Sequence, residues 1–428
     1  MRFERHSVMT SKRDVRGFTL VELLVAIIAG LLVAAAAISF SKQSTRFFSQ
    51  EARIAAAQMS VLSGFQRLQG DISRASYMST PNMKRDLDND RVCAPNYANW
   101  PAALRTLTGL QVTAGGSNTV PAKMPDDKYP DTIRIAGSLS SSEVFPVRTI
   151  EAQGAGHDVY LQINNGAMTR SGFTEGADLT PVFKPGRILR IVDQQRKQEY
   201  EVITAASFPT GGQPVIRTGG PLPLKGDLTI GVERSAPCGI EGFAVGVQAN
   251  VIDLVEYGIA NLADHALYSS TIYSDAGYAL GDESRTELVR RELLLNEDDP
   301  GPMEDDDSTE IIAEYAVDLR VGLWATNPGG GLVFVPPSTA AIATRMAVDA
   351  NYIPGVGPSG PESVRSVELR LAVRSREIDR RANTDQTDPV LDGGFMFRYA
   401  IPNSSGGFSR VRTLLADVTL PNQGGESW

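Results

Sequence analysis

An uninterrupted apolar run near the N-terminus constrains this chain more than any other feature. The sixteen residues from Leu23 to Ile38 carry no charge, and five basic residues lie among the first seventeen. The 23 residues from Phe18 to Phe40 can cross a bilayer of about 30 Å at about 1.5 Å per helical residue. Basic residues favour the cytoplasmic side of a membrane. We therefore predict a membrane helix over about 18–40, with the N-terminus in the cytoplasm and the bulk of the chain outside it.

The single acidic residue of this segment, Glu22, lies at its start. A carboxylate inside a membrane or a helical bundle is costly and needs a partner. The alternative is a glutamate at the membrane interface whose side chain reaches the headgroups. The basic N-terminus does not look like a secretory signal, because its small residue, Gly17, precedes the apolar region instead of following it.

The helical pattern continues beyond the apolar segment. No proline occurs between Phe18 and Met78. Apolar residues recur at helical spacing at Ile54, Val61, Phe65, Leu68 and Ile72. We predict one long helix over 18–79, with its second half amphipathic and packed on a folded head. Pro81 marks the latest position at which this helix can end.

The remainder of the chain predicts a large β-rich head. The whole sequence holds 40 glycines and 25 prolines, which favours many turns. Alternating or β-branched segments predict strands. These segments are 131–136, 158–163, 187–192, 199–203, 251–257, 266–273, 286–293, 317–324, 367–374 and 408–420. We also predict a helical turn at 311–315 and a Gly/Pro-rich loop over 327–361.

The predicted fold class is therefore α+β, a long N-terminal helix packed on a large antiparallel β-rich head. Within the head, residues 80–245 are loop-rich and residues 246–428 are more regular, so we predict two parts with these bounds. Net charge is −9, and no basic, aromatic-rich patch follows the first seventeen residues. This balance argues against direct binding of nucleic acid.

The two cysteines, Cys93 and Cys238, both lie far beyond the predicted membrane segment. Disulfides form in exported proteins, so we predict that these two cysteines are bonded to each other. The alternative is two buried free thiols that never meet.

Three aspartates, Asp86, Asp88 and Asp90, are spaced like the start of an EF-hand calcium loop. Arg91 occupies the glycine position of that motif, and Tyr97 occupies the position of the closing acid. We interpret the segment as a solvated turn and a weak calcium candidate. The acidic run 297–307 is likewise interpreted as a flexible surface loop, with calcium as the weaker alternative.

The sequence contains no catalytic constellation that we can identify. Its three histidines are His6, His157 and His265, and we interpret the last two as ordinary surface or core residues. No G-x-S-x-G, H-E-x-x-H or phosphate-binding glycine loop is present. We predict no enzymatic activity and no cofactor.

The stretch Gly17-Phe18-Thr19-Leu20-Val21-Glu22, opening an apolar helix, resembles the class III signal of type IV pilins and pseudopilins. The resemblance implies cleavage between Gly17 and Phe18 by a prepilin peptidase, which would remove residues 1–17 as a leader. It also implies N-methylation of Phe18. Glu22 would then pair, during assembly, with the new amine of Phe18 in the same or a neighbouring subunit.

A looser resemblance concerns the head. Residues 65–77, 287–291, 312–321 and 366–376, with a strand near Tyr257, resemble parts of PilW-type minor pilins. This resemblance implies a subunit present in few copies, in the complex that primes assembly and sits at the tip. The implied partners are other minor pilins, the major pilin, the prepilin peptidase, the inner-membrane assembly platform and membrane lipid. The implied location is the inner membrane and then the pilus base or tip at the cell surface.

Two other functions remain open on the sequence. One is a minor pseudopilin of a type II secretion or DNA-uptake system, because the N-terminal signal is common to both classes. The other is a tip adhesin or ligand-binding module, in which the large head recognises a partner. Loss of piliation with secretion intact would favour the minor pilin.

Overall fold

The structure is a computed structural model of the 428-residue chain. It describes residues 19–115, 129–220, 222–225, 238–241, 246–263, 265–269, 285–296, 301–327, 330–337, 339–348, 360–375, 398–400 and 408–423. The chain divides into two compact units, Met1–Ser60 and Val61–Trp428.

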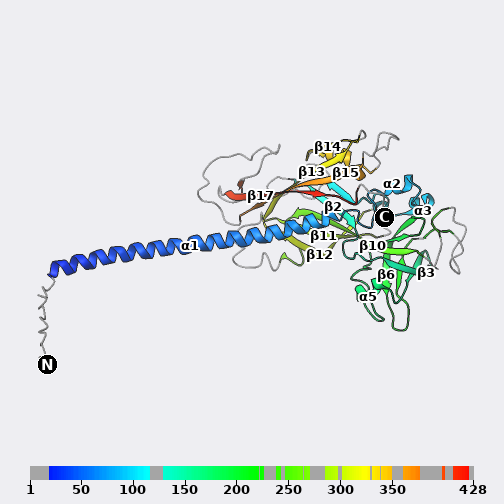
Figure 1. Cartoon of the computed structure of the whole chain (residues 1–428), viewed down its shortest axis with the longest axis horizontal. Helices are drawn as coiled ribbons and strands as arrows, with labels where there is room; N and C mark the ends of the chain where they lie inside the picture. The colour runs from blue at the N-terminus through cyan, green and yellow to red at the C-terminus, as the bar shows by residue number, and fades with distance from the viewer. Residues whose placement is uncertain are drawn as a thin grey trace, which may run out of the picture. The chain divides into compact units, whose positions relative to one another are not determined.

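The first element is the long helix α1, Leu20–Ser73, with 54 residues (Figure 1). It ends at Ser73, earlier than the predicted end at 79. Beyond it the backbone leaves the right-handed helical region, because Ser76 and Met78 have φ values of 63° and 52°. The N–H of Ser76 donates instead to the carbonyl of Ala136, at 2.9 Å. The helix therefore ends where its backbone begins to bond to a strand.

Within the second unit, the last turns of α1 bury one apolar face. Phe65, Leu68 and Ile72 are buried in the main core, as the helical spacing predicts. Val61 is partly buried against the same core, whereas Leu62 is exposed. The amphipathic part of the predicted helix is thus confirmed over residues 61–73. The side chain of Ile54 lies outside the described residues.

Gly64 permits a close approach between α1 and the strand β12, Met303–Ala313. A Cβ atom at Gly64 would lie 1.8 Å from the carbonyl oxygen of Ile312, whereas one at Gly70 would meet nothing within 4 Å. We expect Gly64→Ala to lower the free energy of unfolding by about 1–3 kcal/mol, through overpacking. Gly70→Ala should instead raise it by roughly 0.5–1 kcal/mol, because it removes a glycine from a helix interior. Urea unfolding of both variants measures the difference, and an equal effect at both positions would contradict the close approach.

Among the described residues, the largest sheet has ten strands, and its pairs are antiparallel. They are β1 (Leu110–Thr113), β2 (Thr132–Gly137), β3 (Phe145–Gln153), β4 (Gly156–Leu161), β5 (Ile188–Val192), β6 (Gln198–Ser207), β7 (Val215–Thr218), β10 (Gln248–Ala260), β11 (Glu287–Leu294) and β12. The 13-residue strand β10 is shared between two parts of this sheet. Residues 248–252 pair with β3 and β5, and residues 253–260 pair with β2 and β11.

Six of these strands close into a barrel. Their order is β10-β3-β4-β7-β6-β5, and β5 pairs back with β10. A separate cluster of apolar side chains fills the interior, including Phe145, Ile191, Ile203 and Ile216. Closure removes the free edges that an open sheet would present along these strands.

In the part of the chain that the structure describes, a second sheet has five strands in the order β14-β13-β15-β17-β16. Its strands are β13 (Ala316–Thr326), β14 (Leu332–Val335), β15 (Val364–Arg374), β16 (Arg398–Ala400) and β17 (Phe408–Thr419). Alternate residues of β13 and β15, such as Leu319, Val321 and Leu369, join Phe65 and Leu68 of α1 in the main core. The same core contains residues of β1, β2, β10 and β11, so both sheets hold the last turns of α1.

The remaining described elements are short. Two strands, β8 and β9, form a parallel pair. These elements are β8 (Leu224–Lys225), β9 (Ile240–Glu241), α2 (Met83–Asp88), α3 (Ala94–Asn99), α4 (Ala102–Arg105), α5 (Gly166–Arg170), α7 (Thr339–Arg345) and a 3₁₀ turn (Pro361–Ser363). The predicted fold class, a long helix followed by a large antiparallel β-rich head, is confirmed.

Two local predictions on β12 are wrong. The predicted helical turn at 311–315 begins within the end of this strand, and the predicted acidic loop becomes strand from Met303 onward. Residues 297–300 lie outside the described part. The reason is non-local: β11 pairs with β12, and Arg291 and Lys184 bind the carboxylates of Glu304 and Asp305. These bases neutralise charges that would otherwise disfavour a strand.

Two further segments also differ from their predictions. Residues 266–268 form a turn and residue 269 is helical, so the predicted strand 266–273 does not begin there, and residues 270–273 lie outside the described part. The predicted loop 327–361 contains the strand β14 and the helix α7. Pairing of β14 with β13 and burial of Ile342 stabilise these elements. Such long-range contacts override weak local signals.

Candidate functional site

The N-terminal part of α1 is the first candidate site, because it presents apolar side chains around its whole circumference. An 18-residue stretch within the segment Leu20–Thr45 has a mean hydropathy of 2.8, and Leu20 and Phe40 are 79% and 74% exposed. By length and composition this segment can cross a membrane. An exposed apolar surface of this length requires lipid or other apolar helices as its surroundings.

Glu22 occupies a defined place at the start of this helix. The N–H and the hydroxyl of Thr19 both donate to the Glu22 carboxylate, each at 3.0 Å. In return, the N–H of Glu22 donates to the Thr19 hydroxyl, at 3.3 Å. Because α1 begins at Leu20, Thr19 is the N-cap and Glu22 is the third helical residue. This reciprocal pair is a capping box.

The Thr-x-x-Glu spacing of a capping box is present in the sequence, although our prediction did not use it. The box directs the carboxylate back toward the first turn, where the N–H groups of a helix lack partners. Gly17 and Phe18 lie outside the described residues, which begin at Thr19. Glu22 therefore points toward the end of the helix at which the predicted cleavage would create a new amine.

The predicted disulfide is confirmed. Cys93 and Cys238 are bonded, with their Cα atoms 5.3 Å apart and a sequence separation of 145 residues. Cys93 is the N-cap residue of α3. The bond therefore joins the start of this helix to the segment that leads into β9.

The three candidate calcium ligands do not converge. Asp86 is buried within α2 and lies 3.7 Å from Arg91. Asp88 pairs with two bases of its own helix, whereas Asp90 pairs with Lys197, at 2.6 Å. Nowhere in the described part of the chain do three His, Cys, Asp or Glu side chains gather as a metal ion would need. The segment is a helix with its acids in separate ion pairs.

The two histidines beyond the N-terminus make ordinary contacts. His157 is buried, and its Nδ1 accepts a hydrogen bond from the N–H of Leu222, at 3.1 Å. Burial lowers the pKa of His157, which keeps the ring neutral. His265 lies 3.3 Å from the Thr309 hydroxyl.

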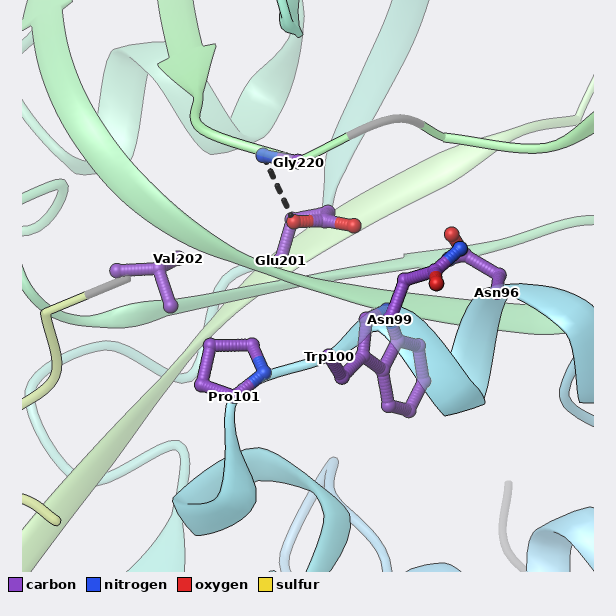
Figure 2. A pocket seen from close by; sticks show the side chains of 7 residues that line it. All are labelled: Asn96, Asn99, Trp100, Pro101, Glu201, Val202 and Gly220. Carbon is purple, nitrogen blue, oxygen red and sulfur yellow. Dashed lines mark hydrogen bonds between the residues drawn. The ribbon is translucent and has the colours of Figure 1, made fainter. Parts of the chain in front are cut away.

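A second candidate site is a small pocket lined by residues of α3 and β6 and by neighbouring loops. Its volume is about 110 Å³, and Figure 2 shows the residues that line it: Asn96, Asn99, Trp100, Pro101, Glu201, Val202 and Gly220. The carboxylate of Glu201 accepts a hydrogen bond from the N–H of Gly220, at 3.2 Å. Two carboxamides, a carboxylate and an indole ring thus line a space large enough for a few water molecules or a small polar group.

The buried carboxyl group of Glu199 binds the side chain of Asn96, one of the residues that line this pocket. It accepts hydrogen bonds from the N–H of Cys93 and from the side-chain amide of Asn96, each at 3.0 Å. Burial, only partly offset by these bonds, raises the pKa of Glu199 to about 8. Glu199 is therefore largely protonated at neutral pH.

This raised pKa predicts a pH dependence of stability. The unfolded chain releases the Glu199 proton near pH 4.5 and the folded chain near pH 8, so the folded state loses stability as pH rises between these values. The loss attributable to this group has a slope of at most about 1.4 kcal/mol per pH unit. Glu199→Gln should remove this dependence on pH. The free energies of unfolding of wild type and variant, measured with urea, should therefore diverge progressively from about pH 5 to pH 8. A constant difference across this range would contradict the assignment.

Comparison with known proteins identifies the N-terminal segment. Residues 12–38 match the prokaryotic N-terminal methylation motif. The N-terminus is thus similar to a prepilin-type signal. This finding supports a structural subunit of the type IV pilin or pseudopilin kind, processed by a prepilin peptidase and anchored in a membrane by its apolar helix. No curated protein and no solved structure matches the chain.

Proposed function

We propose that this chain is a minor pilin, a structural subunit that enters a type IV pilus in few copies. The observation that carries the proposal is the methylation motif over residues 12–38, joined to an apolar helix that begins with the Thr19–Glu22 capping box. The large head favours a low-copy subunit, because a filament of many copies is built more easily from small heads. The proposed place is the complex that primes assembly and then the tip of the pilus.

The proposed processing concerns the first residues of the chain. A prepilin peptidase on the cytoplasmic face of the inner membrane cuts between Gly17 and Phe18, and Phe18 is then N-methylated. Before assembly, α1 anchors the subunit in the membrane with the head outside the cytoplasm. During assembly, α1 leaves the lipid and joins the helices of other pilins. Mass spectrometry of the mature N-terminus tests both modifications.

Glu22 is the proposed assembly residue, through an ion pair with the amine of Phe18 in its own or a neighbouring subunit. We expect Glu22→Ala to be processed normally but to be missing from filaments, because a helical bundle leaves that amine without a counter-charge. Processing is read as the size of the subunit, and assembly as its amount in sheared filaments. Gly17→Val is the control that should block processing itself.

A matched variant separates the charge of Glu22 from its capping role. Glutamine also serves at this position of a capping box, so Glu22→Gln keeps the cap and removes the charge. If pairing with the amine drives assembly, Glu22→Gln should be missing from filaments, like Glu22→Ala. Normal assembly of Glu22→Gln would show that the carboxylate acts only as a cap.

Deletion of the whole subunit tests the system to which it belongs. A minor pilin is required for surface pili and twitching, whereas protein secretion remains intact. Loss of secretion with normal piliation would assign the chain to a pseudopilus instead. Reintroduction of the intact chain must restore the lost property in either case.

A further inference from the structure

Residues 83–107 form an insertion whose first and last residues lie next to each other in the structure. Asn82 and Thr108 form an antiparallel bridge, and the N–H of Met83 donates to the carbonyl of Leu107, at 3.0 Å. The helices α2, α3 and α4 lie within this excursion. Residues 83–107 are therefore an insertion with a closed base.

Residues 138–252 are a second insertion of the same kind. Gly137 at the end of β2 and Asp253 in β10 lie opposite each other in one antiparallel ladder. The carboxylate of Asp253 accepts hydrogen bonds from the N–H groups of Leu139 and Ser140, which closes the base of the insertion. This insertion holds β3 to β9 and the barrel portion of β10.

The two insertions pack on each other, and we call the contact between them the seam. One apolar cluster contains Met83, Trp100 and Leu104 from the first and Tyr200 and Val202 from the second. Trp100 and Tyr200 meet edge to face with their ring centroids 5.9 Å apart. The pocket of Figure 2 lies along this seam, with lining residues from both insertions.

The disulfide joins the same two insertions covalently. Cys93 lies in the first insertion and Cys238 in the second. Glu199 of the second insertion accepts a hydrogen bond from the N–H of Cys93, so a polar contact lies next to the covalent one. The seam is therefore held by apolar packing, by hydrogen bonds and by a bond that is stable outside the cytoplasm.

Contacts between these insertions and the remainder of the head are more polar. Arg85 binds Glu362 at 2.8 Å. Lys184 binds carboxylates of β11 and β12, and the side-chain amide of Asn250 donates to the carbonyl of Met78, at 2.8 Å. Three apolar residues from outside the insertions also join the cluster at the seam, namely Ala136, Leu254 and Leu295. Contacts of this polar kind are typical of interfaces between domains.

Among the described residues, the core that holds the last turns of α1 contains no buried side chain from these insertions. The buried members of that core lie in α1, β1, β2, β10 to β15, β17, α7 and the neighbouring segments, all outside 83–107 and 138–252. Among the described residues, Leu139 at the base of the second insertion packs against this core and is only partly buried. Residues 61–73 of α1 are therefore held by buried side chains that neither insertion supplies.

We propose that residues 83–107 and 138–252 form one accessory lobe, which opens as a unit independently of the core that holds residues 61–73. Its disulfide keeps the two insertions together outside the cytoplasm. The opening behaviour itself does not depend on any pilus.

Hydrogen exchange on the purified full-length chain in detergent tests this unit. In the variant that combines Cys93→Ser and Cys238→Ser, we expect exchange in 94–99 and in 198–203 to accelerate together, on the order of 100-fold or more. Peptides covering 65–73 and 319–323 should keep their wild-type rates. Asp71→Ala, which disturbs the core, should accelerate exchange in 65–73 and leave 198–203 unchanged.

Three results would overturn the proposal. One is acceleration confined to a single insertion, which would show that the two do not open together. The second is equal acceleration in 65–73 and in the lobe, which would show that lobe and core open as one. The third is an unchanged exchange rate in both insertions of the double cysteine variant, which would show that the lobe does not open by itself.

A measurement in cells separates the lobe from the proposed function. The double cysteine variant should enter filaments as efficiently per molecule as wild type, because the core and α1 are intact. Failure of that step alone, with the exchange pattern as expected, would show that filament assembly requires an intact lobe, and it would leave the independent opening of the lobe standing.

Discussion

Replacing Cys93 and Cys238 together by serine is expected to lower the free energy of unfolding by about 4–5 kcal/mol. The bond joins residues separated by 145 positions, and such a long loop gains much conformational freedom in the unfolded chain when the bond is absent. Urea unfolding of the oxidised wild type and the variant measures the effect. A difference of this size is a large part of the stability of an ordinary domain.

Reduction supplies the matched control for this prediction. Wild type treated with a thiol reductant should unfold at the urea concentration of the serine variant, and the reductant should leave the variant unchanged. If oxidised wild type and variant unfold together, the bond contributes nothing to stability. That result would mean that the seam between the two insertions is held by its non-covalent contacts alone.

Removal of the Asp71 carboxylate is the other change with a large expected effect. Its Oδ2 accepts hydrogen bonds from the Tyr257 hydroxyl at 2.7 Å and from the Arg290 guanidinium at 2.9 Å. Burial raises the pKa of Tyr257, so its hydroxyl remains a donor at every physiological pH. We expect Asp71→Ala to cost about 3–5 kcal/mol, because it leaves a largely buried guanidinium and a buried hydroxyl without this acceptor.

Arg67 provides the comparison for Asp71 within the same helix. Its guanidinium lies 3.8 Å from the Asp71 carboxylate, and its side chain is 52% exposed. Arg67→Ala should therefore cost less than about 1 kcal/mol, as solvated ion pairs do. The free energies of unfolding of both variants, measured with urea, show how much more the contacts of Asp71 contribute to stability than the contact of Arg67. An Asp71→Ala variant as stable as Arg67→Ala would show that Asp71 does not anchor α1 to β10 and β11.

Much of the strand content of the head could be predicted because alternation is a local signal. The predicted segments 251–257 and 367–374 fall in strands of the structure, and 131–136 and 187–192 do so except for their first residue. The errors have a common cause. At β12, partners distant in the chain, including Lys184 and Arg291, stabilise a strand whose acidic sequence favours a loop. Sequence periodicity carries no information about such partners.

The candidate site was predicted unevenly for the same reason. Glu22 and its apolar helix are marked by adjacent residues, and the disulfide followed from the number of cysteines and their position beyond the membrane segment. The EF-hand-like spacing of the three aspartates at 86, 88 and 90 was a weaker guide, because the helix α2 separates their carboxylates. The buried Glu199 and the pocket next to it had no signal in the sequence that we can identify.

The sequence by itself determined the N-terminal segment of this protein. Charge, hydropathy and the motif around Glu22 are properties of neighbouring residues, and they are enough to specify an apolar helix with a processing signal. Only the tertiary structure decided the organisation of the head. Closure of the barrel depends on β10 meeting β5, and the covalent seam of the lobe depends on Cys93 meeting Cys238. These pairings join residues far apart in the chain, so packing and loop closure decide them, not local preference.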